Sequence, residues 1–255
     1  VQRVVQERGL YLRRLKQDVL PSLPSKTFHR VLVPFQPVQE RAYVAALEGM
    51  IHDLRAADNI TFKRNLASFL AQRSALIQIC SCPGQVVDGY QETPAKILAL
   101  DEILEELIAC RGEKVVLWSF FTASLSAAVA RYARFNPVRI DGSVADVADR
   151  REAVRRFQED DDAMLFIGNP AAAGAGLTLH RARFSVYESM SNQAAHYLQS
   201  LDRIHRRGQT RDTEYLVLLC DRSIEVSEYE RLLAKEQASQ DLLGDHMEPS
   251  LTRET

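Results

Sequence analysis

The residues best suited to chemistry lie together at 199–209, in the string Gln-Ser-Leu-Asp-Arg-Ile-His-Arg-Arg-Gly-Gln. Arg203 and Arg206 are three residues apart, so the helix predicted over this stretch places them on one face. Two guanidinium groups suit a triphosphate whose terminal group gains charge during transfer, because arginine stays protonated and presents a rigid fork of donors. Gln199 and Asp202 lie on the neighbouring turn, where we expect them to orient the arginines. Two arginines alone also fit a solvated basic helix end.

The elements around this string predict a parallel sheet covered by helices on both faces, because short apolar runs alternate with helical patterns of ten or more residues. The predicted strands are residues 114–119, 138–140, 164–167, 184–187 and 213–219; the predicted helices are residues 94–110 (with Thr93 as N-cap), 122–135, 147–158, 194–206 and 224–243. Ligands bind at the carboxyl ends of the strands in such sheets. The turn at 141–143 and the small-residue loop at 168–176 fall there.

The first part of the chain has a different pattern. Residues 28–34 alternate like a short strand, and apolar residues between 38 and 79 recur at helical spacing, which predicts a helical protrusion. A loop rich in Gly and Pro separates this part from the rest. The predicted organisation is an entry segment at 1–35, a helical protrusion at 36–92, an α/β lobe at 93–243 and a disordered polar tail at 244–255.

Composition narrows the class of protein. The net charge of the 255 residues is -2, so a nucleic-acid site must be a local basic patch. No apolar run approaches the roughly 20 residues that span a bilayer. Cys80 and Cys82 flank a single serine with no second Cys/His pair, which predicts reduced thiols and no metal site. We expect an intracellular protein, cytoplasmic in a bacterium or otherwise nuclear, and a chain cut from a longer one.

The string at 199–209 closely resembles the sixth helicase motif of the SWI/SNF-family ATPases of superfamily 2, and meets every fixed position of the pattern Q-x-x-D-R-x-H-R-x-G-Q. Further segments resemble the family in order and spacing: 11–27 (entry into the second lobe), 113–122 (fourth motif), 139–157 (the segment after it), 170–179 (fifth motif) and 221–243 (closing helix). The resemblance covers nearly the whole chain up to about residue 243. It implies a RecA-like second motor lobe of a DNA-dependent ATPase.

The resemblance implies a nucleotide site shared between two lobes. Arg203 and Arg206 act as arginine fingers on ATP, which a first lobe binds together with Mg²⁺. Gln199 and Asp202 belong to the same nucleotide site. The glycines of the fifth motif, Gly174 and Gly176, let backbone approach the nucleotide or DNA where a Cβ would collide.

The resemblance also implies contacts to the backbone of double-stranded DNA. Asp141, Gly142 and Ser143 would present backbone amides and a hydroxyl to a phosphate, and Ser119 and Asn169 are expected in the same role. Such contacts position a strand but read no sequence. Where the family often carries a Trp-Asn pair before its sixth motif, this chain has Ser-Asn-Gln at 191–193, and its one tryptophan, Trp118, is predicted to lie in the core.

The sequence contains neither a G-x-x-x-x-G-K-[ST] phosphate loop nor a D-E-x-H string. We therefore expect this fragment to be inactive alone and to act with an N-terminal RecA-like lobe of the same protein. Three other classes stay open: an RNA helicase lobe, a non-catalytic nucleic-acid-binding module with a motor fold, and a metabolic nucleotide-binding enzyme. The form of the sixth motif argues against the first, the intact arginines against the second, and the lack of a G-x-G-x-x-G fingerprint against the third.

Overall fold

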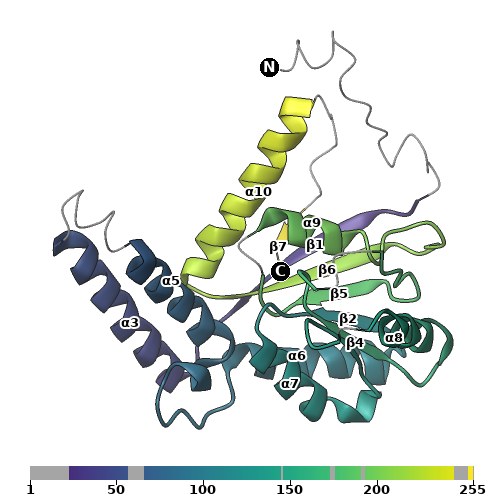
Figure 1. The fold of residues 1–255 in the computed structure, drawn as a ribbon, viewed down its shortest axis with the longest axis horizontal. Coiled ribbons are helices and arrows are strands. Elements are labelled where there is room, and N and C mark those ends of the chain that lie inside the picture. The colour runs from purple at the N-terminus through teal and green to yellow at the C-terminus, as the bar shows by residue number, and fades with distance from the viewer. Residues whose placement is uncertain are drawn as a thin grey trace.

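The computed structural model describes residues 23–56, 66–144, 146–172, 176–190, 193–243 and 252–254. A seven-stranded sheet runs through them in the order β3-β4-β2-β5-β6-β1-β7, and every neighbouring pair is parallel (Figure 1). The strands are β1 (Lys26–Val33), β2 (Val115–Trp118), β3 (Val138–Ile140), β4 (Leu165–Gly168), β5 (Phe184–Tyr187), β6 (Thr213–Cys220) and β7 (Thr252–Glu254). The predicted α/β fold with a parallel sheet is confirmed.

Helices cover both faces of the sheet, as predicted. α6 (Ala95–Leu104), which Glu105–Cys110 continues as a π-helix, and α7 (Thr122–Arg131) pack on one face. α8 (Val147–Glu159), α9 (Ala194–Leu201) and α10 (Ile224–Leu243) pack on the other. Successive residues of a strand point to opposite faces of the sheet. Val115 and Leu117 therefore pack against α6 and α7, and Val116 and Trp118 lie in the core beneath α8, α9 and α10. Among the described helices, none has both the length and the apolar composition needed to cross a bilayer.

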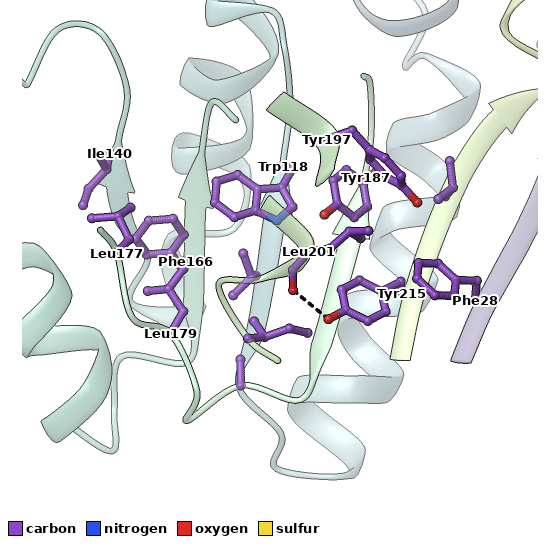
Figure 2. Packing of buried hydrophobic residues seen from close by; sticks show 14 of the residues in the cluster. Phe28, Trp118, Ile140, Phe166, Leu177, Leu179, Tyr187, Tyr197, Leu201 and Tyr215 are labelled. Carbon is purple, nitrogen blue, oxygen red and sulfur yellow. Dashed lines mark hydrogen bonds between the residues drawn. The ribbon is translucent and has the colours of Figure 1, made fainter. Parts of the chain in front are cut away.

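The core between the sheet and the helices α8, α9 and α10 is rich in aromatic residues (Figure 2). Trp118 is completely buried there, and its indole N–H donates to Ser185 Oγ at 3.0 Å, which confirms the prediction that it is a core residue. Phe28 of β1 stacks on Tyr215 of β6 with ring centroids 4.8 Å apart. The Tyr215 hydroxyl donates to the carbonyl of Leu201 at 2.8 Å and so fixes the end of α9 against the sheet (Figure 2).

Two helices form the predicted protrusion. α3 (Pro37–Ala56) and α5 (Leu66–Ser81) lie side by side and extend away from the sheet (Figure 1). Pro37 is the first residue of α3, a position that needs no backbone donor. Tyr43 of α3 packs with Leu76 and Cys80 of α5 and with Cys220 of β6, so a small separate core attaches the protrusion to the sheet.

The start of α6 differs from the prediction. Thr93 does not cap it; the N-cap is Pro94, which offers no side-chain bond. The backbone N–H of Ala95 instead donates to Gln39 Oε1 of the protrusion at 2.9 Å. This helix begins at a buried junction, where a side chain 56 residues away in sequence satisfies the donor that a local cap would otherwise serve.

The chain termini were predicted as an entry segment and a disordered tail. Residues 1–22, 244–251 and 255 lie outside the described residues. The prediction of disorder is wrong for Thr252–Glu254, which pair in parallel with β1 from Phe28 to Arg30. Without β7, β1 would be the edge of the sheet, and the unpaired backbone groups of an edge strand accept an extended segment of almost any sequence.

Candidate functional site

The predicted helix over residues 194–206 ends early. α9 stops at Leu201, and residues 202–209, which we call the arginine turn, follow as a series of turns. The carbonyl groups that would continue the helix have other partners: Leu201 accepts from the Tyr215 hydroxyl at 2.8 Å, and Arg203 accepts from the backbone N–H of Leu179 at 2.9 Å. The argument that Arg203 and Arg206 share a helical face is therefore wrong.

The arginine turn nevertheless brings Arg203 and Arg206 near each other. Only 8% of Arg203 is exposed, and burial followed by the charge of Arg206 lowers the pKa of its guanidinium. Arg206 is half-buried, and its Nη1 donates to the carbonyl of Leu177 at 3.1 Å. Arg206 also contributes, after burial and Arg181, to a lowered pKa of His180. The result is a cationic corner in which histidine is held toward its neutral form.

Gln209 fixes the arginine turn, and sequence reasoning assigned it no role. Its Nε2 donates to the carbonyls of His180, Ala182 and Ile204 at 3.0, 2.9 and 3.3 Å. Gly208 adopts φ +102, and a Cβ there would lie 3.3 Å from the His180 ring, so both backbone conformation and space favour glycine. The fixed Gly-Gln of the sixth motif was the available signal for this role.

The two other residues predicted for the nucleotide site lie beside this corner. Gln199 is exposed on α9. Asp202 ends α9, and its carboxylate lies 3.7 Å from the ammonium of Lys26. The Asp202 charge also acts on Arg203, where it opposes the lowering of the pKa. The orienting role expected for Gln199 and Asp202 stays a prediction.

A second group of predicted residues lies at the carboxyl ends of the strands. We call residues 119–121, 141–144, 169–172 and 188–190 the strand-end loops; they follow β2, β3, β4 and β5. From β2 the chain continues through α7 toward β3, and from β5 through α9 toward β6, on opposite sides and opposite faces of the sheet. Such a switch point is where open α/β sheets bind ligands.

Backbone bonds extend the sheet into these loops. The N–H of Ser119 donates to Gly168 at 3.0 Å, that of Asn169 to Ile140 at 3.3 Å, and that of Glu188 to Trp118 at 2.9 Å. The structure therefore brings Ser119, Asn169 and the turn at 141–143 together at the carboxyl ends of the strands, as the sequence predicts.

The Asp141 carboxylate organises the turn that it begins. Its Oδ1 accepts from the backbone N–H and the hydroxyl of Ser143 at 2.9 and 2.5 Å, and its Oδ2 accepts from the Arg139 guanidinium. Burial raises the pKa of this carboxyl, but the bonds from Ser143 and Arg139 outweigh it and hold the pKa below its ordinary value. The donors of Ser143 that were expected to face a phosphate are used inside the turn, whereas Gly142 is exposed.

The side chains of Asn169 and Ser119 are also used within the loops. Asn169 Nδ2 donates to the carbonyl of Phe120 at 2.8 Å, and its Oδ1 accepts from the backbone N–H of Ala171 at 2.8 Å. Ser119 is buried, and its hydroxyl donates to Glu188 Oε2 at 2.7 Å. In this conformation both residues shape the backbone of the strand-end loops.

Arg150 connects two strand-end loops, and sequence reasoning gave it no role beyond the family pattern. Its Nε donates to the carbonyl of Val144 at 2.6 Å, its Nη1 to Ala172 at 2.9 Å and its Nη2 to Asp141 at 3.3 Å. Three carbonyls from two loops thus fix one guanidinium. The position of Arg150 on α8, one helical turn after the loop that it fixes, was the available signal.

Glycine is favoured at two positions near these loops for different physical reasons. A Cβ on Gly168 would lie 2.8 Å from the Phe166 ring and 2.9 Å from the Trp118 ring, so close packing requires glycine there. Gly176 adopts φ +80 with no atom within 4 Å of a built Cβ, so its backbone conformation favours glycine. Gly174 lies outside the described residues.

One buried group in the described residues has the composition of a metal site. The sulfur atoms of Cys80 and Cys220 and a carboxylate oxygen of Glu225 lie within 4.8 Å of one another. The ammonium of Lys96 is 2.6 Å from that carboxylate, and burial raises the pKa of the Cys80 thiol well above its ordinary value. A neutral thiol and a carboxylate already paired with a cation are poor ligands for a metal ion.

Comparison with known proteins connects both groups of residues to one family. The family model described as "Helicase conserved C-terminal domain" matches residues 95–208. "Protein CHROMATIN REMODELING 4" of Arabidopsis thaliana is 30% identical over 225 residues, which are 78% of this chain and 10% of that protein. The chain is a C-terminal helicase lobe of the SWI/SNF family. This lobe spans only 10% of the length of that relative, and 22% of the length of "Chromodomain-helicase-DNA-binding protein 1-like" of Danio rerio.

Solved structures have the fold of this SWI/SNF lobe. The Sulfolobus solfataricus SWI2/SNF2 ATPase C-terminal domain aligns with a TM-score of 0.63 at 18% identity, over 86% of this chain and 90% of that one. The Sulfolobus solfataricus SWI2/SNF2 ATPase core in complex with dsDNA aligns with a TM-score of 0.68 at 22% identity, over 96% of this chain and 52% of that one.

Proposed function

We propose that this SWI/SNF lobe is the second half of an ATP-driven translocase on double-stranded DNA. In the full-length enzyme, an N-terminal RecA-like lobe binds ATP and Mg²⁺, and this lobe supplies Arg203 and Arg206 to the γ-phosphate. The Sulfolobus neighbour solved with duplex DNA and the relative named for chromatin remodelling support this proposal.

The observation that carries the proposal is the cationic corner. Arg203 is nearly buried, and Arg206 is close enough to lower its pKa, so the lobe maintains two like charges near each other. A polyanion bound between the two charges would offset their mutual repulsion. Because the transferred phosphoryl group gains charge at its oxygens in the transition state, two fixed guanidinium groups stabilise it more than the ground state.

We propose that the strand-end loops contact the DNA backbone. The Asp141 carboxylate fixes the turn at 141–143 by accepting two hydrogen bonds from Ser143. Gly142, between them, is exposed. Backbone contacts of this kind accept any base sequence. The turn at 141–143, which follows β3, and the arginine turn, which precedes β6, belong to different connections of the sheet, so DNA and nucleotide would be bound by separate residues.

The test is the ATPase rate of the full-length protein without nucleic acid, with duplex DNA and with duplex RNA of the same sequence. The proposal predicts stimulation by duplex DNA and little by RNA. Stimulation by RNA alone would assign the lobe to an RNA helicase. An ATPase rate that stays at background in all three conditions would make it a non-catalytic module.

A further inference from the structure

The ammonium group of Lys96 connects three elements of the fold. Lys96 is the second residue of α6, and its side chain is completely buried. Its Nζ donates to Glu225 Oε1 at the start of α10 at 2.6 Å, to the carbonyl of Glu188 after β5 at 2.7 Å, and to Ser81 Oγ at the end of α5 at 3.5 Å. We call Lys96, Glu225, Glu188 and Ser81 the Lys96 cluster.

The helical protrusion ends in this cluster. Gln39 of α3 accepts from the N–H of Ala95, next to Lys96, and donates to the carbonyls of Ile79 and Cys80, next to Ser81, at 2.7 and 3.2 Å. The Tyr43 hydroxyl accepts from the N–H of Ile224, next to Glu225, at 2.8 Å. Both protrusion helices are therefore connected by buried hydrogen bonds to the residues that surround Lys96.

The other side of the cluster reaches the strand-end loops. Lys96 binds the carbonyl of Glu188, and the Glu188 carboxylate accepts from the Ser119 hydroxyl at 2.7 Å. Ser119 Oγ lies 3.1 Å from Ser189 Oγ, which accepts from the N–H of Phe120 at 2.9 Å. Asn169 holds the carbonyl of the same residue, Phe120, at 2.8 Å. Hydrogen bonds, joined through the covalent structure of residues 95–96 and of Glu188, thus connect α3 to the loop after β2.

Stability alone is a weak reason for this arrangement. Burial lowers the pKa of Lys96 and is the largest single influence on it, but the Glu225 carboxylate together with Cys220, Glu188 and Cys80 outweighs burial and holds this pKa above its ordinary value. The Lys96 ammonium is thus maintained inside the protein, whereas burial raises the pKa of Glu225 against the opposing effect of Lys96. Replacing a buried ion pair with apolar residues of similar volume is often neutral for stability or increases it. What apolar residues cannot supply is directional bonds that fix α5, α10 and the end of β5 at one point.

We infer that Lys96 and Glu225 are positioning residues that couple the helical protrusion to the strand-end loops, so that the protrusion sets the geometry in which these loops hold DNA. This inference rests on the proposed function. The protrusion would then influence how DNA stimulates the motor, through the hydrogen bonds of the Lys96 cluster.

The test uses full-length protein with the double substitution Lys96→Met and Glu225→Gln. The pair is removed together, so no charge of the pair is left uncompensated, and glutamine can still accept from the Cys220 N–H that Glu225 holds at 3.0 Å. We expect a melting temperature near that of wild type and DNA-independent ATPase unchanged. The concentration of duplex DNA that gives half-maximal stimulation should rise roughly tenfold. Wild-type activation by DNA in a folded double variant overturns the inference.

Two further variants complete the design. The matched control is Arg131→Met with Asp101→Asn, which removes an ion pair between α7 and α6 and should leave DNA activation unchanged. Tyr43→Phe removes only the hydroxyl that holds Ile224, and should raise the half-maximal DNA concentration by a smaller factor. If the double variant does not fold, the Tyr43→Phe variant provides the test. A half-maximal DNA concentration equal to that of wild type in this variant then overturns the inference. A wild-type enzyme that DNA does not stimulate contradicts the proposed function, and the inference with it.

Discussion

At the scale of single residues, polar side chains near both sites act mainly on the backbone around them. Asp141 holds the N–H of Ser143, Asn169 holds the carbonyl of Phe120, and Gln209 holds three carbonyls of its surroundings. A phosphate-binding loop needs its amides aimed in advance, because ordering them during binding would cost conformational entropy. Under the proposed contact with the DNA backbone, these side chains supply that order.

Asp141 provides a test of this view. Asp141→Asn should destabilise the protein by about 1.5–3 kcal/mol at pH 7, because the buried acceptor loses the charge that strengthens its bonds from Ser143 and pairs with Arg139. The pKa of Asp141 is below its ordinary value in the fold, so its contribution is present above the unfolded pKa and disappears as pH falls through the folded one. Urea unfolding at pH 7, 5 and 3 measures the difference, which should shrink toward pH 3. A difference that is independent of pH, or equal to that of Asp162→Asn at an exposed site, contradicts this role.

At the scale of elements, the sequence predicts every strand from β1 to β6 and every helix of the lobe, because short buried runs and helical periodicity depend on neighbouring residues. The failures occur where distant residues decide. Tyr215 and Leu179 bind the carbonyls that end α9, and Gln39 replaces Thr93 at the start of α6. The Lys96 cluster was not predictable for the same reason, since Lys96 and Glu225 are 129 residues apart in sequence.

The candidate site was predictable in composition but not in geometry. The motif spacing predicts that Arg203 and Arg206 act together; the charge of Arg206 does act on Arg203, but the two residues lie in a turn and not on a helical face. The spacing gives no sign that the Ser143 hydroxyl and the Asn169 side chain are occupied inside the loops. Those bonds depend on side-chain orientation, which a linear pattern does not contain.

The carboxyl end of β4 tests how tightly the elements pack below the strand-end loops. Gly168→Ala places a Cβ 2.8–2.9 Å from the rings of Phe166 and Trp118, and overpacking of this kind costs about 1–3 kcal/mol. Chemical denaturation of the purified protein should show that loss. Gly84→Ala is the control, because no atom lies within 4 Å of its Cβ. Equal stabilities of the two variants would contradict the packing described for β2 and β4.

At the scale of the whole molecule, charge limits how DNA is bound. With a net charge of -2, the isolated lobe should bind duplex DNA weakly and without sequence preference. Each neutralised phosphate contributes about -0.9 to the slope of log K against log salt, so contact with a few phosphates predicts a slope of roughly -3 or shallower. Fluorescence anisotropy from low to physiological salt measures this slope. Tight, sequence-selective binding would contradict backbone contact through the strand-end loops.

The division of labour between two lobes gives a second prediction at this scale. The isolated lobe should hydrolyse no ATP above background, with or without DNA, because its sequence holds no phosphate loop and no D-E-x-H string. A phosphate-release assay on the purified lobe measures this. DNA-stimulated turnover by the lobe alone would mean that the half-motor account is wrong.

The most direct test of the central claim is the DNA-stimulated turnover of the full-length protein with Arg203→Ala or Arg206→Ala. An arginine finger contributes on the order of 10³–10⁵ to phosphoryl transfer, so either substitution should abolish most turnover while DNA affinity remains. Arg206→Lys should restore little, because an ammonium lacks the forked contact. Arg207→Ala is the matched control, since Arg207 is exposed in the same turn and should be dispensable. If all three alanine variants lose turnover equally while remaining folded, or if the first two keep it, Arg203 and Arg206 are not the arginine fingers.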